Sequence, residues 1–165
     1  MPTRNLVLIG MPGCGKTRIG QLLAKNLTWD FLDTDQQIEE KAQCGIPEIF
    51  SAHGEAFFRQ LESEVAAACS ALHGKVIATG GGIVLLPENI RMLKQNGRLY
   101  YLRRNLDMLD RRDRPLSSSP EALEKLFLQR APLYLQAADC VIDNQALPET
   151  AVRAILEDFY ENSGH

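Results

Sequence analysis

Short apolar runs alternate with amphipathic segments along the chain. Flanking glycines and sequence spacing favour strands for the apolar runs, although a buried helical segment of that length would look the same. The first, third and fourth runs are almost continuously apolar, which is typical of strands covered by helices on both faces. The alternation predicts an α/β domain of βα units around a parallel sheet. The expected strands are residues 5–9, 29–32, 75–78, 99–102 and 140–142.

The segments between these strands carry helical signals. Across residues 55–72, apolar side chains recur at three- and four-residue steps, which predicts one buried helix face. Pro87 and Pro120 fit the first turn of a helix, and the serines before Pro120 can cap one. Residues 111–119 lack apolar periodicity and predict an exposed, mobile loop. The expected helices are residues 17–26, 35–42, 55–72, 87–95, 106–110, 120–134 and 148–161.

Composition narrows the function classes. The 165 residues suit a single domain, and 45% hydrophobic with 24% charged residues is ordinary for a globular protein. The net charge of −3 argues against nucleic acid as the main partner. The four cysteines form no C-x-x-C pair and no secretion signal accompanies them, so we expect a cytoplasmic protein without disulfides. The longest uncharged stretch is too short for a membrane span.

The strongest motif follows the first expected strand. The eight residues GMPGCGKT match G-x-x-x-x-G-K-T, with a helical segment after them. Glycines let backbone N–H groups converge on phosphate oxygens, so Gly13, Cys14 and Gly15 are candidate ATP-binding residues. Lys16 would reach the β- and γ-phosphates, and the Thr17 hydroxyl would ligate Mg²⁺. The alternative is a glycine-rich turn with a capping threonine. Cys14 is either an acidified thiol or a small residue tolerated in the loop.

Two carboxylates end the second expected strand. Asp33 and Asp35 would face a ligand crevice at the carboxyl edge of a parallel sheet. One could orient Mg²⁺ or its waters while the other accepts a hydrogen bond from an attacking hydroxyl. Helix capping explains them equally well, because Thr34-x-x-Gln37 fits a capping box and Asp33 suits a helix start.

Arg59 and Glu62 lie three residues apart, on one side of an expected helix. They form either a surface ion pair of small energetic value or a rigid fork in which Glu62 holds the guanidinium for a substrate carboxylate. The spacing does not choose between these alternatives.

Three consecutive glycines, Gly80 to Gly82, end the third expected strand. They indicate close approach of another group to the backbone, with a substrate favoured over a plain sharp turn.

Five arginines cluster at Arg103, Arg104, Arg111, Arg112 and Arg114. A solvated charge run is the default interpretation. With a phosphate-binding loop in the same domain, an arginine on a mobile loop could instead close over a transferring phosphoryl group.

The ordered set GMPGCGKT, DTD, GEAFFR with a glutamate three residues on, TGGG, RPL and RAPLY resembles the shikimate kinases. It spans residues 10–134. The resemblance implies a single-domain P-loop kinase, residues 1–165, with a five-stranded parallel sheet and a mobile lid at about residues 111–119. It implies transfer of the γ-phosphate of ATP to the 3-hydroxyl of shikimate, with Mg²⁺, and we expect a monomer.

The resemblance also implies residue roles. Lys16 and Arg114 are similar to the phosphate-stabilising pair, with Arg114 on the lid. Thr17 resembles the Mg²⁺ ligand and Asp33 its outer support. Asp35 resembles the residue that holds the substrate hydroxyls and accepts the proton.

For shikimate, Arg59, Arg130 and the glycines Gly80, Gly81 and Gly82 resemble the binding set, in which both arginines clamp the carboxylate. Gln145 falls near the adenine in this comparison. Two alternatives remain: another small-molecule kinase of this fold, such as a gluconate or nucleoside-monophosphate kinase, and a regulatory protein that binds nucleotide without turnover.

Overall fold

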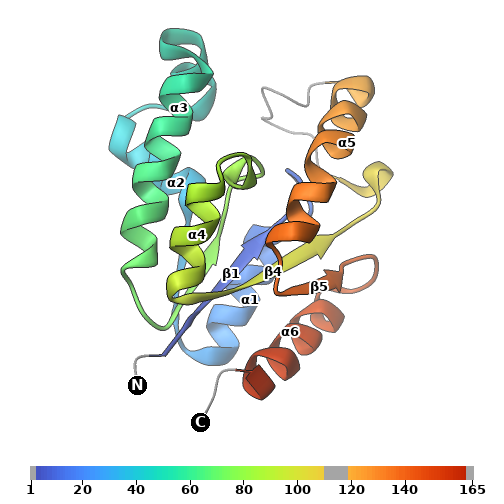
Figure 1. Ribbon diagram of the computed structural model, residues 1–165. Helices are drawn as coiled ribbons and strands as arrows, with labels where there is room; N and C mark the ends of the chain where they lie inside the picture. Colours follow the sequence, from blue (N-terminus) through green and yellow to red (C-terminus); the bar gives the residue numbers. More distant parts are fainter. Residues whose placement is uncertain (1–2, 110–118, 163–165) are drawn as a thin grey trace.

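The central sheet has five parallel strands in the order β2-β3-β1-β4-β5 (Figure 1). The computed structural model describes residues 3–109 and 119–162. β1 lies between β3 and β4, with Leu6 opposite Val76 and Val7 opposite Leu99. The expected five-stranded parallel sheet is therefore confirmed. The strands are β1 (Asn5–Ile9), β2 (Asp30–Asp33), β3 (Lys75–Ala78), β4 (Gly97–Arg103) and β5 (Cys140–Asp143).

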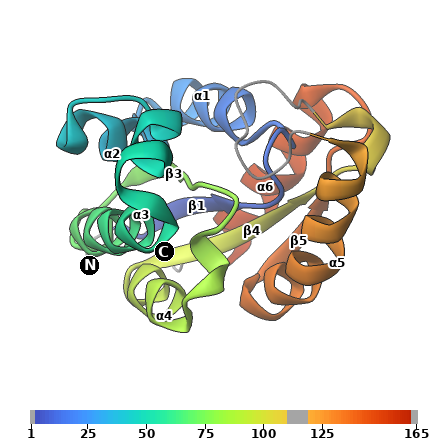
Figure 2. The ribbon, with the colours of Figure 1, turned by 90° about the horizontal axis from the view of Figure 1, so that it is seen from above.

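Helices cover both faces of this sheet. Figure 2 shows α1 and α6 on one side and α4 and α5 on the other, and α3 packs against α4. Two short 3₁₀ helices, η1 (Ile83–Leu85) and η2 (Leu106–Met108), lie between the longer elements. The α-helices of the described residues are α1 (Lys16–Leu27), α2 (Thr34–Ala42), α3 (Ile46–Ser70), α4 (Pro87–Gln95), α5 (Pro120–Ala137) and α6 (Pro148–Asn162).

Two helical predictions differ from the structure, and one short helix was not predicted. α3 begins at Ile46, well before residue 55, and Gly54 interrupts its helical geometry with φ 83° and ψ 173°. This break separates a short first stretch, which the sequence pattern did not reveal, from the long amphipathic one. In the described part of the expected helix at residues 106–110, the structure has only the 3₁₀ helix η2, and η1 was not expected. The predicted mobile loop at residues 111–119 lies outside the described residues, except for Ser119.

Ser119 ends that loop as the cap of α5. Its hydroxyl oxygen accepts a hydrogen bond from the Ala122 N–H at 3.1 Å, and Pro120 occupies the first turn. The predicted serine cap before Pro120 is confirmed, and the missing proline N–H is harmless there.

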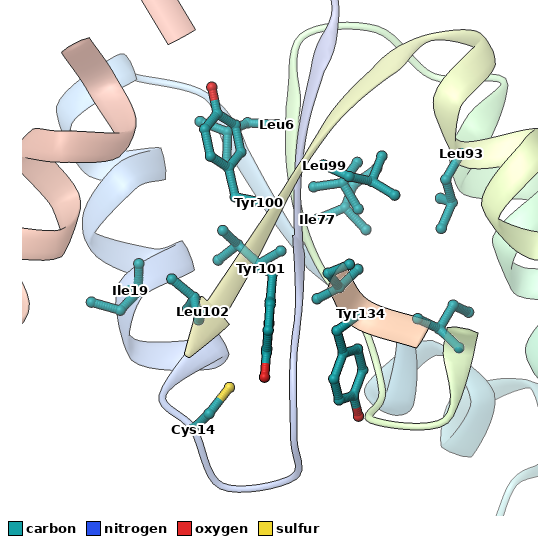
Figure 3. Packing of buried hydrophobic residues seen from close by; sticks show 14 of the residues in the cluster. Leu6, Cys14, Ile19, Ile77, Leu93, Leu99, Tyr100, Tyr101, Leu102 and Tyr134 are labelled. Carbon is teal, nitrogen blue, oxygen red and sulfur yellow. The ribbon is translucent and has the colours of Figure 1, made fainter. Parts of the chain in front are cut away.

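The core lies on both sides of β1, whose five residues are all buried. Figure 3 shows the side chains of β4 packed beside it, with the Cys14 sulfur turned toward them. The rings of Tyr101 and Tyr134 lie with their centroids 5.1 Å apart. This contact joins α5 to β4 and places a tyrosine of α5 under the carboxyl edge of the sheet.

All four cysteines are free, as the sequence predicts: Cys14 and Cys69 are buried, and Cys44 and Cys140 are partly exposed. In the part of the chain that the structure describes, no helix has both the length and the apolar character to cross a membrane.

A polar network fastens α6 to β4. Asp158 accepts hydrogen bonds from Arg98 at 2.7 and 3.1 Å and from the Tyr100 hydroxyl at 2.7 Å. Tyr100 is fully buried, so its hydroxyl depends on this one acceptor. The hydrogen bond from Arg98, supported by that from Tyr100, holds the pKa of Asp158 below its usual value of 3.8.

We predict that Asp158→Asn lowers the free energy of unfolding by about 1–3 kcal/mol at pH 7, because the buried hydroxyl and the guanidinium lose their charged acceptor. A lowered folded-state pKa stabilises the fold above pH 3.8 and ceases to do so as the pH falls through the folded value. The difference between variant and wild type should therefore shrink below pH 4. Urea unfolding at pH 7 and pH 3 measures both effects.

Glu157→Gln provides the control, since Glu157 is an exposed neighbour on the same helix. It should unfold like the wild type. Equal stability of Asp158→Asn and wild type at pH 7 would contradict the role of this network.

Candidate active site

A crevice of about 680 Å³ opens at the carboxyl edge of the sheet. The segments that follow β1 and β3 line it. The strand order reverses between these two strands, and ligands of open parallel sheets usually bind at such a point. Figure 1 shows α3 and α5 extending beyond this edge on either side. The crevice is lined by Gly13, Gly15, Lys16, Thr17, Arg18, Asp33, Asp35, Gln36, Glu39, Ile46, Pro47, Thr79, Gly80 and Gly81.

The phosphate-binding loop, residues 10–15 between β1 and α1, forms one wall. Its last residue, Gly15, caps α1 with φ 101°, a conformation that favours glycine. The Lys16 ammonium donates hydrogen bonds to the carbonyl oxygens of Gly10 at 2.6 Å and Met11 at 2.9 Å. The loop thus presents a helix N-terminus and a lysine at the same wall, as anion binding requires.

Asp33 caps α2, one of the two roles that the sequence left open, and it also contacts Thr17. Its Oδ1 accepts hydrogen bonds from the N–H groups of Asp35 at 2.9 Å and Gln36 at 3.3 Å, so it caps α2. Its Oδ2 accepts the Thr17 hydroxyl at 3.2 Å. The proposed capping box is wrong, because the Thr34 hydroxyl instead accepts the Gly80 N–H at 3.0 Å.

The pair of Thr17 and Asp33 fits Mg²⁺. The two side chains bring a hydroxyl and a carboxylate oxygen together at the crevice, and hard oxygen donors are the ligands that Mg²⁺ prefers. Among the described residues, no group of three or more His, Cys, Asp or Glu side chains could hold a metal ion. Mg²⁺ in phosphoryl-transfer sites commonly takes only one or two protein ligands and completes its shell with phosphates and water.

Glu62 is buried and Arg59 is half-buried, so their pair is not a surface ion pair. The Arg59 guanidinium donates to Glu62 Oε1 at 2.9 Å and reaches Glu55 at 3.3 Å. The Glu62 side chain is only 1% exposed and that of Arg59 13%. Burial raises the pKa of the Glu62 carboxyl above its usual range, and the adjacent Arg59 opposes that shift.

Two further charged groups belong to the same cluster. Asp35 raises the pKa of Glu62 and Arg130 lowers it, so both act on this carboxylate through space. Arg130 comes from α5 and is 3% exposed. Within the described residues, the buried Nε atoms of Arg59 and Arg130 and the Oε2 atom of Glu62 have no hydrogen-bond partner. The site therefore holds both hydrogen-bond donors and a hydrogen-bond acceptor that are not used within the described residues.

The three glycines after β3 are required by neighbouring side chains. A Cβ on Gly80 would lie 2.5 Å from Asp35 Oδ1, and one on Gly81 would lie 2.6 Å from Pro12. A Cβ on Gly82 would collide with the Arg59 guanidinium. Close approach to this backbone is thus confirmed for protein groups, which include candidate site residues, while approach of a substrate stays a prediction.

Tyr134 is a site residue that the sequence reasoning missed. Its hydroxyl, fully buried, donates to the Gly81 carbonyl, and burial raises the pKa of this phenol. The tyrosine lies four residues after Arg130 on α5, within the RAPLY motif. That helical spacing places both on one face and is the signal that could have identified it.

The predicted site residues that the structure describes but that are absent from the crevice lining are Cys14, Arg59, Gly82, Arg130 and Gln145. Cys14 is 1% exposed, and its side chain faces the core. Gln145 accepts from the Asn105 N–H at 3.0 Å and donates to the Arg103 carbonyl at 3.3 Å, away from the described crevice lining.

The arginine cluster does not form one group in the described residues. Arg103 pairs with Asp143 at 2.7 Å, and Arg104 donates to the carbonyls of Met108 and Asn144. Arg111, Arg112 and Arg114, the predicted lid residues, lie outside the part of the chain that the structure describes.

Known proteins have similar sequences and a similar fold. The sequence model of the shikimate kinase family matches residues 12–160. A shikimate kinase of Bordetella avium is 41% identical over 92% of this chain and 77% of its own length. One of Thermodesulfovibrio yellowstonii is 38% identical over 94% and 95%, respectively. A solved structure, shikimate kinase from Acinetobacter baumannii in complex with shikimate, superposes with a TM-score of 0.92 at 34% identity, covering 99% of this chain and 96% of that one. This chain belongs to the shikimate kinase family.

Proposed function

We propose that this protein transfers the γ-phosphate of ATP to the 3-hydroxyl of shikimate, giving shikimate 3-phosphate and ADP. The observation that carries the proposal is the cluster of Arg59, Glu62 and Arg130 beside Asp35. Asp35 itself lines the crevice together with the phosphate-binding loop. Two arginines whose guanidinium groups lie close to one buried carboxylate suit an anionic acceptor such as a carboxylate. The family membership supports the same substrate.

The ATP phosphates would bind along the loop between β1 and α1. Its backbone N–H groups and the N-terminus of α1 stabilise negative charge there, and Lys16 adds a full positive charge. Thr17, with Asp33 behind it at 3.2 Å, would hold Mg²⁺. When bound, the ion offsets the charge of the phosphate oxygens. Arg114, which lies outside the described residues, is proposed to stabilise the transferring phosphoryl group on the strength of the family resemblance.

Asp35 is proposed to orient the acceptor hydroxyl. It lies in the first turn of α2 and lines the crevice, and Gly80 packs against its carboxylate. A carboxylate here can accept a hydrogen bond from a substrate hydroxyl and receive its proton as the oxygen attacks phosphorus. The remaining catalysis is positioning and charge stabilisation, as in other phosphoryl transfers.

Arg59 and Arg130 are proposed to bind the shikimate carboxylate. They come from α3 and α5, which extend beyond the carboxyl edge of the sheet on either side (Figure 1). Glu62 restrains one of them: its carboxylate accepts Arg59 at 2.9 Å and so limits the conformations of the guanidinium before substrate arrives. A preorganised arginine loses less entropy on binding than a free one.

We also infer a cytoplasmic monomer that binds small molecules. The four free cysteines suit a reducing compartment. The proposed contacts to ATP and shikimate all come from one chain, so the reaction needs no residue from a partner subunit.

The direct test is a coupled assay for ADP with Mg²⁺ and ATP. We predict that ADP production depends on shikimate, with little ATP hydrolysis in its absence. Gluconate and nucleoside monophosphates serve as alternative acceptors. Turnover with either of these, or none with shikimate, would refute the assignment.

We predict that Arg59→Ala and Arg130→Ala each raise the KM for shikimate ten- to hundredfold, because each loses a charge-assisted hydrogen bond worth about 1.5–3 kcal/mol. The KM for ATP should remain nearly unchanged. Arg91→Ala is the matched control, since Arg91 is exposed and pairs only with Glu88 on α4 in the described structure. Steady-state kinetics in both substrates measures the effect, and wild-type values for either site variant would count against the clamp.

Glu62→Gln should raise the KM for shikimate roughly tenfold, because the neutral amide holds Arg59 less firmly than a carboxylate does. The raised pKa of Glu62 adds a pH signature. In the wild type, the KM should begin to rise on acidification while the pH is still above the usual glutamate value of 4.5. The variant, which has no proton to gain at this position, should lack that component. Identical pH profiles would exclude Glu62 as the holder of Arg59.

A further inference from the structure

Asn144, which follows β5 directly, is a buried asparagine bonded to the phosphate-binding loop. Its side chain is 2% exposed, and Nδ2 donates to the Cys14 carbonyl at 2.9 Å. Its backbone N–H donates to the Arg103 carbonyl at 2.8 Å, and its own carbonyl accepts Arg104 at 3.2 Å. The side chain that contacts the loop is thus anchored by the ends of β4 and β5.

This hydrogen bond fixes the orientation of one peptide group. The described chain contains no cis peptide bond, so the Cys14 carbonyl and the Gly15 N–H point in opposite directions. Asn144 holds the carbonyl on the side of β5, and Gly15 lines the crevice. The Gly15 N–H is thereby directed away from Asn144, toward the side on which phosphates would bind.

Such a peptide needs an external restraint. Glycine adopts conformations with positive and negative φ about equally readily, so the peptide before Gly15 could rotate and turn its carbonyl oxygen toward the phosphates. A carbonyl oxygen there would repel an anion, whereas an N–H attracts it. The amide of Asn144 opposes that rotation, because rotation would break its hydrogen bond.

Asn144 and Gly15 are also matched sterically. A Cβ on Gly15 would lie 2.8 Å from Asn144 Nδ2, and Gly15 has φ 101°. Any larger residue at this position would push the amide away from the carbonyl it holds. The glycine of the GKT sequence therefore makes room for the asparagine as well as for a ligand.

We propose that Asn144 is a positioning residue for ATP, one that keeps the Cys14–Gly15 peptide with its N–H toward the phosphates. The role rests on the proposed function insofar as it takes the loop to bind ATP. Asn144 touches no reacting atom and acts through the loop backbone. It also links the loop to Arg104 at the end of β4, so strand and loop hold one another in place.

The test compares Asn144→Asp and Asn144→Ala in the full chain. The aspartate keeps the shape but offers the Cys14 carbonyl an oxygen in place of a donor, so the KM for ATP should rise at least about tenfold. The alanine loses one neutral hydrogen bond and should raise it roughly fivefold. The KM for shikimate should change less than about twofold in either variant, because effects on a site that is not coupled to the substituted residue are usually this small. Calorimetric titration with Mg²⁺-ATP, without shikimate, should show the same losses of affinity.

Asn5→Ala is the matched control. Asn5 is 1% exposed and donates to the Leu72 carbonyl at 2.8 Å, at the opposite end of β1 from the loop. It should lower the melting temperature in a comparable way and leave ATP affinity unchanged. Asn144→Ala provides the binding measurement if the aspartate variant does not fold.

The outcomes separate the two proposals. Wild-type ATP affinity in a folded Asn144 variant, or equal rises in the KM for both substrates, would overturn the positioning role. If the wild type binds ATP but does not phosphorylate shikimate, the proposed function fails, while weaker ATP binding by the Asn144 variants would still support this inference.

Discussion

The site depends on a buried ion pair. Glu62 is nearly inaccessible to water, yet it holds Arg59 at 2.9 Å and experiences the charges of Asp35 and Arg130. Burying such a pair costs desolvation energy, so the pair is poor evidence of a stabilising interaction. The pair instead fixes the geometry of the site. Without Arg59, the buried Glu62 charge would be uncompensated, and without Glu62, the Arg59 guanidinium would be more mobile. A cluster with two cations, two anions and unused hydrogen-bonding atoms is suited to receive a small polar ligand that carries one more carboxylate.

The backbone around this cluster joins the two halves of the crevice. The glycines after β3 let Asp35 and Arg59 lie against the chain, and Gly81 packs on Pro12 of the phosphate-binding loop. The Tyr134 hydroxyl fixes the Gly81 carbonyl from the other side. The segment that would contact shikimate and the loop that would contact ATP therefore touch directly. Such contact supports in-line transfer, which requires donor and acceptor at a fixed separation.

Much of this arrangement was predictable from local sequence patterns. The apolar runs located all five strands to within two residues, and the G-x-x-x-x-G-K-T motif placed the loop correctly. The start of α3 was missed because Gly54 breaks the helical period. The spacing of Arg59 and Glu62 could not reveal that the pair is buried, since burial depends on how α3 packs. No sequence pattern indicated the role of Asn144, because the Cys14 carbonyl that it contacts lies far away in the sequence.

We propose that Arg59 and Arg130 select the substrate by its carboxylate. The most direct measurement compares shikimate with its neutral carboxamide, which keeps the ring and hydroxyls and loses only the charge. We expect the wild-type kcat/KM to favour shikimate by roughly a hundredfold, as for a charged group held by two guanidinium ions. Arg59→Ala should reduce that preference. Equal kcat/KM values for acid and amide in the wild type would contradict the account.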